Sequence, residues 1–299
     1  MKKSTRIMLI VFSCLFAVGF VTALIAAALT GFNYKFFNTT DLNKVSYTPE
    51  GEFNSIYISA ADGDVEFYVS DDGKCRIECM ENDNVKHRAE ITGGTLNILR
   101  ESEGVFGINF GFDETCDIRV YLPENSYRDL YVESASGDVF VPRGIDFSQV
   151  RIYTKSGDAE VKSSCDELLL VQTVSGEIDI EDVYSSSVSL STTSGDISTE
   201  NFKADSLLLN SVSGEITVEN TIAEKELFAE SISGDIELDG SNSPNIKIKT
   251  TSGNVSGSLK TNKVFTVKSI SGSIKVPKSE GNEECAVTTA SGDIDIEID

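Results

Sequence analysis

Thr192-Thr193-Ser194-Gly195-Asp196-Ile197 contains one of nine copies of a short motif that runs through the C-terminal half of this chain. The glycines of successive copies are 19 or 20 residues apart. A period that constant indicates one supersecondary unit stacked on itself. The nine glycines are Gly137, Gly157, Gly176, Gly195, Gly214, Gly234, Gly253, Gly272 and Gly292.

Apolar residues alternate with polar ones on both sides of each Ser-Gly. In the copy around Gly195 they are Val188, Leu190 and Ile197. This alternation predicts two strands per unit, each with one buried face, and the excess of β-branched residues agrees. The glycine is expected at the corner between the strands, in a left-handed conformation that only glycine takes without a Cβ penalty.

A unit of 19–20 residues is too short for two antiparallel hairpins and fits one coil of a parallel β-solenoid. We therefore predict an all-β fold, a single-stack and right-handed solenoid of nine coils over residues 130–299. The chain stops in the strand after Gly292, so that coil is expected to be terminal, with one neighbour. Apolar residues in the connections predict a short third side; they are Ile145, Cys165, Val183, Phe202 and Ile222.

A hydroxyl column lies three residues before the corner glycine. Its parity matches the buried columns, so we interpret it as an internal ladder in which each hydroxyl bonds the next coil or the corner backbone. The alternative, an exposed Thr-x-Ser array of the ice-binding kind, conflicts with that parity. The column consists of Ser134, Thr154, Thr173, Thr192, Ser211, Ser231, Thr250, Ser269 and Thr289.

An acidic column directly follows the corner glycine and has the opposite, outward parity. Stacked carboxylates about 4.8 Å apart would repel by roughly 3 kcal/mol before screening, so something must offset the charge. Each carboxylate could accept backbone N–H bonds at its turn. Alternatively, the column binds Ca²⁺ weakly, with a dissociation constant on the order of 10⁻⁴–10⁻³ M. The candidate ligands are Asp138, Asp158, Glu177, Asp196, Glu215 and Asp235; Asp293 is a seventh acid in the column.

The N-terminus carries a candidate membrane anchor. Residues 7–29 are uncharged and mostly apolar, long enough to span a bilayer. Lys2, Lys3 and Arg6 precede them, which predicts a cytoplasmic tail (1–6), an extracellular C-terminal part and a tether over 30–51. The alternative is a signal peptide cleaved near Ala26-Ala27-Ala28.

Residues 52–129 are β-rich without strict periodicity, and we interpret them as an irregular cap with the first coils. Ala61-Asp62-Gly63-Asp64 is a degenerate corner. The stretch from Gly104 to Gly111 predicts a mobile loop that exposes Phe106 and Phe110. No following helix or lysine supports a phosphate-binding loop there.

The net charge limits the possible binding partners, and the cysteine positions limit the possible disulfides and metal motifs. Without Lys2, Lys3 and Arg6 the chain has 22 basic and 48 acidic side chains, a formal −26, which argues against nucleic acid. Cys165 and Cys285 fall in coils too distant to pair. Either Cys75 or Cys79 could reach Cys116. His87 is the single histidine, and no Cys/His spacing matches a zinc motif.

The repeats, together with Gly93-Gly94-Thr95-Leu96-Asn97-Ile98 and the segment from Val120 to Ser134, resemble a bacterial family of β-strand-repeat proteins of unknown function. The family carries an adhesin label and includes the membrane-anchored Lia-type envelope-stress proteins of Gram-positive bacteria. The resemblance covers roughly residues 50–299 and implies the same solenoid; it carries over no catalytic residue.

Three functions follow as hypotheses. The first is a non-catalytic structural, adhesin-like or binding protein at the cell envelope, tethered to the membrane, with a cell-wall component or a membrane protein as partner. The second is an accessory ectodomain of an envelope-stress sensing system, for which a tail of six residues requires a membrane partner. The third is a polysaccharide-active enzyme, disfavoured because connections of about eight residues leave no long loops around a site.

Overall fold

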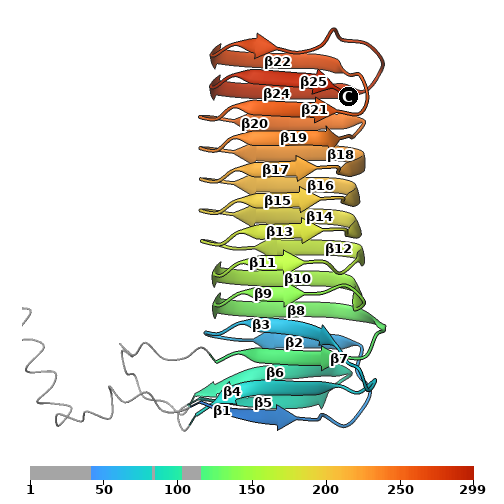
Figure 1. Ribbon diagram of the computed structural model, residues 1–299, viewed down its shortest axis with the longest axis vertical. Coiled ribbons are helices and arrows are strands. Elements are labelled where there is room, and N and C mark those ends of the chain that lie inside the picture. The colour runs from blue at the N-terminus through green and yellow to red at the C-terminus, as the bar shows by residue number, and fades with distance from the viewer. Residues whose placement is uncertain (1–41, 83–84, 103–115) are drawn as a thin grey trace, which may run out of the picture. The chain divides into compact units, whose positions relative to one another are not determined.

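The described residues form two β-sheets that face each other across one apolar core (Figure 1). The computed structural model describes residues 42–82, 85–102 and 116–299. Those residues contain no helix, and nearly all their strands pair in parallel with equivalent strands of neighbouring coils. The prediction of an all-β, parallel β-solenoid is thus confirmed.

Each Ser-Gly repeat supplies one strand to each sheet. Across the 13-stranded sheet the order is β1 (Asn43–Tyr47), β4 (Arg76–Glu81), β7 (Ile118–Leu122), β3 (Val65–Val69), β9 (Val139–Val141), β11 (Ala159–Val161), β13 (Ile178–Glu181), β15 (Ile197–Glu200), β17 (Ile216–Glu219), β19 (Ile236–Ser241), β21 (Val255–Leu259), β25 (Ile294–Ile298) and β23 (Ile274–Lys275). Across the 12-stranded sheet it is β22 (Val264–Ser271), β24 (Glu284–Ser291), β20 (Asn245–Thr250), β18 (Ile222–Ser231), β16 (Lys203–Ser211), β14 (Tyr184–Thr192), β12 (Cys165–Gln172), β10 (Asp146–Ser156), β8 (Ser126–Ser136), β2 (Ser55–Ser59), β6 (Thr95–Ser102) and β5 (Val85–Thr92).

The strand register pairs apolar residues with the equivalent apolar residues of the neighbouring coil. Leu190 of β14 pairs with Leu209 of β16, and Ile197 of β15 pairs with Ile216 of β17. None of these four side chains is more than 1% exposed. The alternation read from the sequence therefore stacks into continuous apolar columns, which is where burial stabilises the fold.

The predicted third side is part of the 12-stranded sheet. Ile145, Cys165, Val183 and Phe202 are buried as expected, each at or just before the start of a strand of that sheet. A register shift then separates the first residues from the rest, as between Cys165 and Leu168. The inward assignment of Ile222 is wrong: it pairs with Lys203 and is half-buried, while the preceding Thr221 is fully buried.

At both ends of the stack, the spatial order of the strands differs from their order along the chain. After β21 the chain forms β22 and β23 at the sheet edges and then returns, so that β24 and β25 fill the place beside β20 and β21. Near the other end β2 and β3 lie between β6 and β7 on one side and β8 and β9 on the other. The expectation of a terminal coil at Gly292 is therefore wrong, because the chain end lies between two neighbours (Figure 1).

The cap is where antiparallel pairing occurs. β4 pairs antiparallel with both β1 and β7, and β5 pairs antiparallel with β6. β1 falls inside the segment 30–51 for which the sequence predicted a polar tether. The strand instead pairs with β4 along its whole length, and its Tyr47 hydroxyl donates to Glu81 of β4 at 2.6 Å.

Three predictions concern residues outside the described ones: the cytoplasmic tail (1–6), the membrane anchor (7–29) and the loop from Gly104 to Gly111. Across residues 42–82, 85–102 and 116–299, no helix has the length and apolarity needed to cross a bilayer.

Candidate functional site: the stacked corners

The corner glycines are required by close packing between coils. A Cβ added to Gly214 would fall less than 3.0 Å from the carbonyl oxygen of Gly195, and one on Gly195 would meet Gly176 in the same way. Among the nine corner glycines, all of them described, Gly137 alone has a left-handed φ, of 109°. The expectation of positive φ at Gly195 and Gly214 is wrong, because their backbone is ordinary and the missing space is the constraint.

A row of left-handed residues lies at the opposite corner, one in each of four successive coils. Asp182, Asn201, Asn220 and Gly240 have φ values of 57°, 51°, 46° and 54°. Asn and Asp tolerate this conformation better than other non-glycine residues. The glycine pattern alone therefore did not predict the left-handed positions at this corner.

The hydroxyl column is internal and points at the corner carbonyls. Thr192 Oγ1 donates to Gly176 O at 3.2 Å, and Ser211 Oγ donates to Gly195 O at 3.2 Å. Ser269, in the edge strand β22, is half-buried; the other column members are at most 6% exposed. Thr154 Oγ1 is buried without a partner. The structure thus supports the internal ladder and contradicts the ice-binding alternative.

Aspartates of the acidic column accept hydrogen bonds from the backbone of the neighbouring coil. Asp138 Oδ1 accepts the N–H of Asp158 at 2.8 Å, Asp158 Oδ1 that of Glu177 at 2.7 Å, and Asp196 Oδ1 that of Glu215 at 2.7 Å. Asp235 and Asp293 accept the N–H groups of Asn254 and Ser273. Aspartates therefore offset part of the stacked charge through turn hydrogen bonds, across coils rather than within one.

The pKa values of two column carboxylates shift in opposite directions. Burial, with Asp158 and Asp196 on either side, raises the pKa of Glu177. The N–H of Ser273 lowers the pKa of Asp293. Among the described residues, ligand atoms from three column carboxylates do not converge within 4.8 Å, so an ion on this column would bridge two coils at most.

A second outward column went unnoticed in the sequence. Two residues before the corner glycine, Val174, Val212, Ile232 and Ile270 are 49%, 41%, 51% and 75% exposed. Thr193 and Thr251 occupy the same column and are exposed as well. Side chains along a strand alternate between the inner and the outer face. Because the hydroxyl column faces inward, the next residue along the chain is expected to face outward, and this alternation could have predicted the exposed column.

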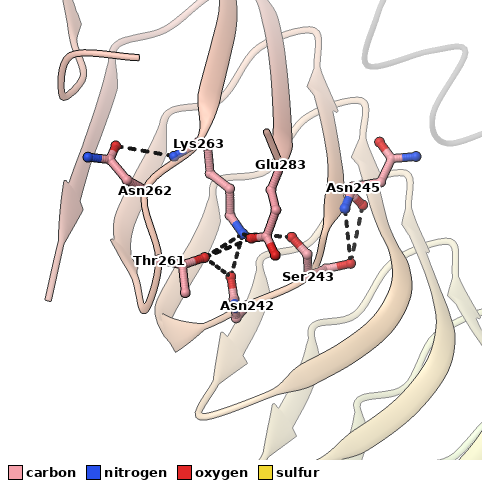
Figure 2. Close-up of polar contacts among 7 residues, drawn as sticks. All are labelled: Asn242, Ser243, Asn245, Thr261, Asn262, Lys263 and Glu283. Carbon is pink, nitrogen blue, oxygen red and sulfur yellow. Dashed lines mark hydrogen bonds and ion pairs between the residues drawn. The ribbon is translucent and has the colours of Figure 1, made fainter. Parts of the chain in front are cut away.

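A fully buried lysine holds the C-terminal inversion together (Figure 2). The Lys263 ammonium donates to Asn242 Oδ1 at 2.6 Å, to Ser243 O at 2.8 Å and to Thr261 Oγ1 at 2.8 Å, and it forms an ion pair with Glu283. These acceptors come from three connections, β19–β20, β21–β22 and β23–β24. The hydrogen bond from Lys263 lowers the pKa of Glu283. One ammonium thus joins the loops that leave and re-enter the stack.

Within the described residues the cysteines form no disulfide, so neither pairing considered for Cys116 is present. These cysteines are Cys75, Cys79, Cys116, Cys165 and Cys285. Burial raises the pKa of the Cys285 thiol to about 12. Cys165 and Cys285 act as small core residues, as predicted.

Repeating strands, inward hydroxyls and cross-coil corner bonds define a repeat protein of the parallel β-solenoid class. Residues 53–297 match the model of the Toastrack DUF4097 family, and the chain belongs to that family. The resemblance read from the sequence is confirmed. No curated protein matches the chain.

Two solved structures share the fold. A protein from Parabacteroides merdae, provisionally assigned as an adhesin, has 14% identity and a TM-score of 0.53 over 87% of this chain and 96% of its own. A protein from Parabacteroides distasonis, provisionally assigned as lipid-binding, has 18% identity and a TM-score of 0.53 over 86% of this chain and 96% of its own. At such identities the likeness concerns the fold.

Proposed function

We propose that this chain is a non-catalytic, adhesin-like or structural protein of the cell envelope, anchored by residues 7–29 with its solenoid outside the cell. The observation that carries the proposal is the exposed surface of the Ser-Gly corner. There the exposed apolar column at Val212 and Ile232 runs directly beside the acidic column. A surface that repeats once per coil suits an extended, repetitive partner, such as a cell-wall component, better than a small molecule.

The backbone makes that surface rigid. Ser213 N donates to Thr193 O at 3.0 Å, and Ser233 N donates to Val212 O at 2.9 Å. Hydrogen bonds between coils thus run through the corner itself and fix the spacing of the exposed side chains. Preorganised side chains lose less entropy on binding.

One depression beside this corner is small for a substrate site. The described surface carries a depression of about 260 Å³ lined by Glu230, Lys249, Lys268 and Ile270. Small-molecule sites usually enclose about 300–1,000 Å³. The provisional adhesin assignment of the Parabacteroides merdae structure agrees with a binding role.

Two measurements on the full chain in its own cells test the proposal. External protease should remove the solenoid from intact cells, while a fragment with residues 7–29 stays in the membrane fraction. A photo-crosslinking amino acid at Val212 or Ile232 should capture envelope material, whereas the same group at exposed Lys225, away from this corner, should not. Protection from protease, or equal capture at all three positions, would contradict it.

A further inference from the structure

Three buried side chains with metal-binding atoms meet in the N-terminal cap. Cys79 and Glu81 lie on the inward face of β4, and His87 lies on the inward face of β5 in the other sheet. Their exposures are 0%, 7% and 5%. One ligand atom from each lies within 4.8 Å of the other two. Buried groups of this kind require partners, since desolvation is costly.

The histidine supplies an independent observation. Its Nδ1 makes no hydrogen bond, although its side chain is only 1% exposed. Nδ1 lies 3.3 Å from Glu81 Oε1, which is an ion-pair distance if the imidazole is protonated, but the contact does not meet the geometry of a hydrogen bond. A buried polar atom without a partner costs about 1–3 kcal/mol and calls for an explanation, one of which is an ion.

The carboxylate is held in place from behind. Tyr47 donates its hydroxyl to Glu81 Oε1 at 2.6 Å, and the backbone N–H of His87 donates to the same oxygen at 2.9 Å. Supporting bonds of this type orient metal ligands and are a regular part of metal sites.

We propose that Cys79 Sγ, Glu81 and His87 Nδ1 bind a Zn²⁺-class cation that joins the two sheets of the cap. A thiolate, an imidazole and a carboxylate are the ligand types that Zn²⁺ takes, with bonds of about 2.0–2.3 Å. Ligands at those lengths in a tetrahedron lie about 3.3–3.8 Å apart, so the three atoms, now within 4.8 Å of one another, would move closer by at most about 1.5 Å when the ion binds.

The fourth position has a protein candidate. Met80 N donates to Asp117 O at 3.0 Å, which sets the buried Cys116 beside the end of β4. Either the Cys116 thiolate or a water molecule would complete the shell. The site would act structurally, because its ligands are buried and come from the two sheets.

Cobalt is the probe, since Co²⁺ reports thiolate ligation and coordination number optically. Full-length protein, purified in detergent and stripped of metal, is titrated with Co²⁺. The expected result is about one equivalent bound per chain, a sulfur-to-cobalt charge-transfer band in the near ultraviolet and the intense visible bands of four-coordinate Co²⁺. Excess Zn²⁺ should abolish both.

Variants locate the ligands. Cys79→Ser and His87→Gln should lower Co²⁺ binding at least tenfold, while Cys165→Ser, a buried thiol in a distant coil, should leave it unchanged. Cys116→Ser distinguishes a thiolate from water in the fourth position by a weaker charge-transfer band. Folded wild-type protein, verified by circular dichroism, that shows no thiolate band would overturn the proposal, as would a Cys79–Cys116 disulfide in the purified chain.

Discussion

The carbonyl oxygen of Gly195 occupies the space that a side chain on Gly214 would need. The same relationship recurs from coil to coil, and the oxygen concerned also accepts the hydroxyl of Ser211. Cys116 completes the pattern: it stacks under Gly63 at the start of the column and carries a Cβ. Glycine is thus required wherever a parallel coil lies beneath the corner.

Close approach and backbone strain can be separated by two substitutions. Gly214→Ala should cost at least about 3 kcal/mol of unfolding free energy, because the Cβ strikes backbone that cannot move alone. Gly73→Ala should cost about 1 kcal/mol, since Gly73 has a left-handed φ of 68° but nothing within 4 Å of the added Cβ. Denaturant unfolding of both variants measures the difference. Equal costs would show that strain, and not packing, selects the glycine.

The inverted C-terminus predicts an unusual response to truncation. Deleting residues 276–299 removes β24 and β25, the sole strand partners that β22 and β23 have among the described residues. We therefore expect the amides of residues 264–275 to lose hydrogen-exchange protection as well, although they remain in the chain. The amides of β16 and β17 are the internal control and should stay protected. Retained protection over 264–275 would contradict the observed strand order.

The sequence predicted the regular coils because each repeat carries its own instructions: alternate apolar residues, an inward hydroxyl and a corner glycine. It did not predict the inversion, since Gly272 and Gly292 have the same local motif and nothing in the motif states which coil comes next. The wrong assignment of φ to Gly195 has a related cause. Local sequence reports that a side chain is forbidden, while the atom that forbids it belongs to another coil.

The buried clusters were also beyond the sequence. Lys263 reads as one more charged loop residue until three connections converge on it. Cys79 and His87 have no metal-motif spacing, because the two sheets and not a single segment bring them together. Long-range placement of polar residues is what periodicity cannot encode.

Removing the Lys263 ammonium should destabilise the C-terminal end. Lys263→Met leaves Ser243 O and Asn242 Oδ1 without a donor they now have and leaves Glu283 without its ion pair, at a cost of about 3 kcal/mol. Lys225→Met is the matched control: its lysine pairs with Asp205 but is 69% exposed, so its loss should stay within about 0.5 kcal/mol. Thermal unfolding compares the two, and similar costs would remove Lys263 from any structural role.

Glu283 predicts a pH dependence with a defined sign. Lys263 lowers the folded-state pKa of this carboxyl below its ordinary value of 4.5. Its contribution to stability is therefore present above pH 4.5 and is lost as the pH falls through the folded pKa. Between pH 7 and acid the wild type should lose more stability than Glu283→Gln, which cannot titrate. Parallel stability curves for the two proteins would show that the ion pair contributes nothing.

Calcium binding along the acidic column stays a prediction that the hydrogen bonds make easier to test. In each aspartate Oδ1 accepts a backbone N–H, as Asp196 does from Glu215. Asp196→Asn keeps an oxygen for that bond and removes the charge, and Glu215→Gln does the same for its neighbour. If an ion bridges adjacent coils with a dissociation constant of about 1 mM, 5 mM Ca²⁺ should add about 1 kcal/mol, or a rise of about 2–4 °C in Tm, beyond NaCl of matched ionic strength. The double variant should lose that excess and retain the fold. An equal response of the double variant to Ca²⁺ would leave the column with its turn hydrogen bonds alone.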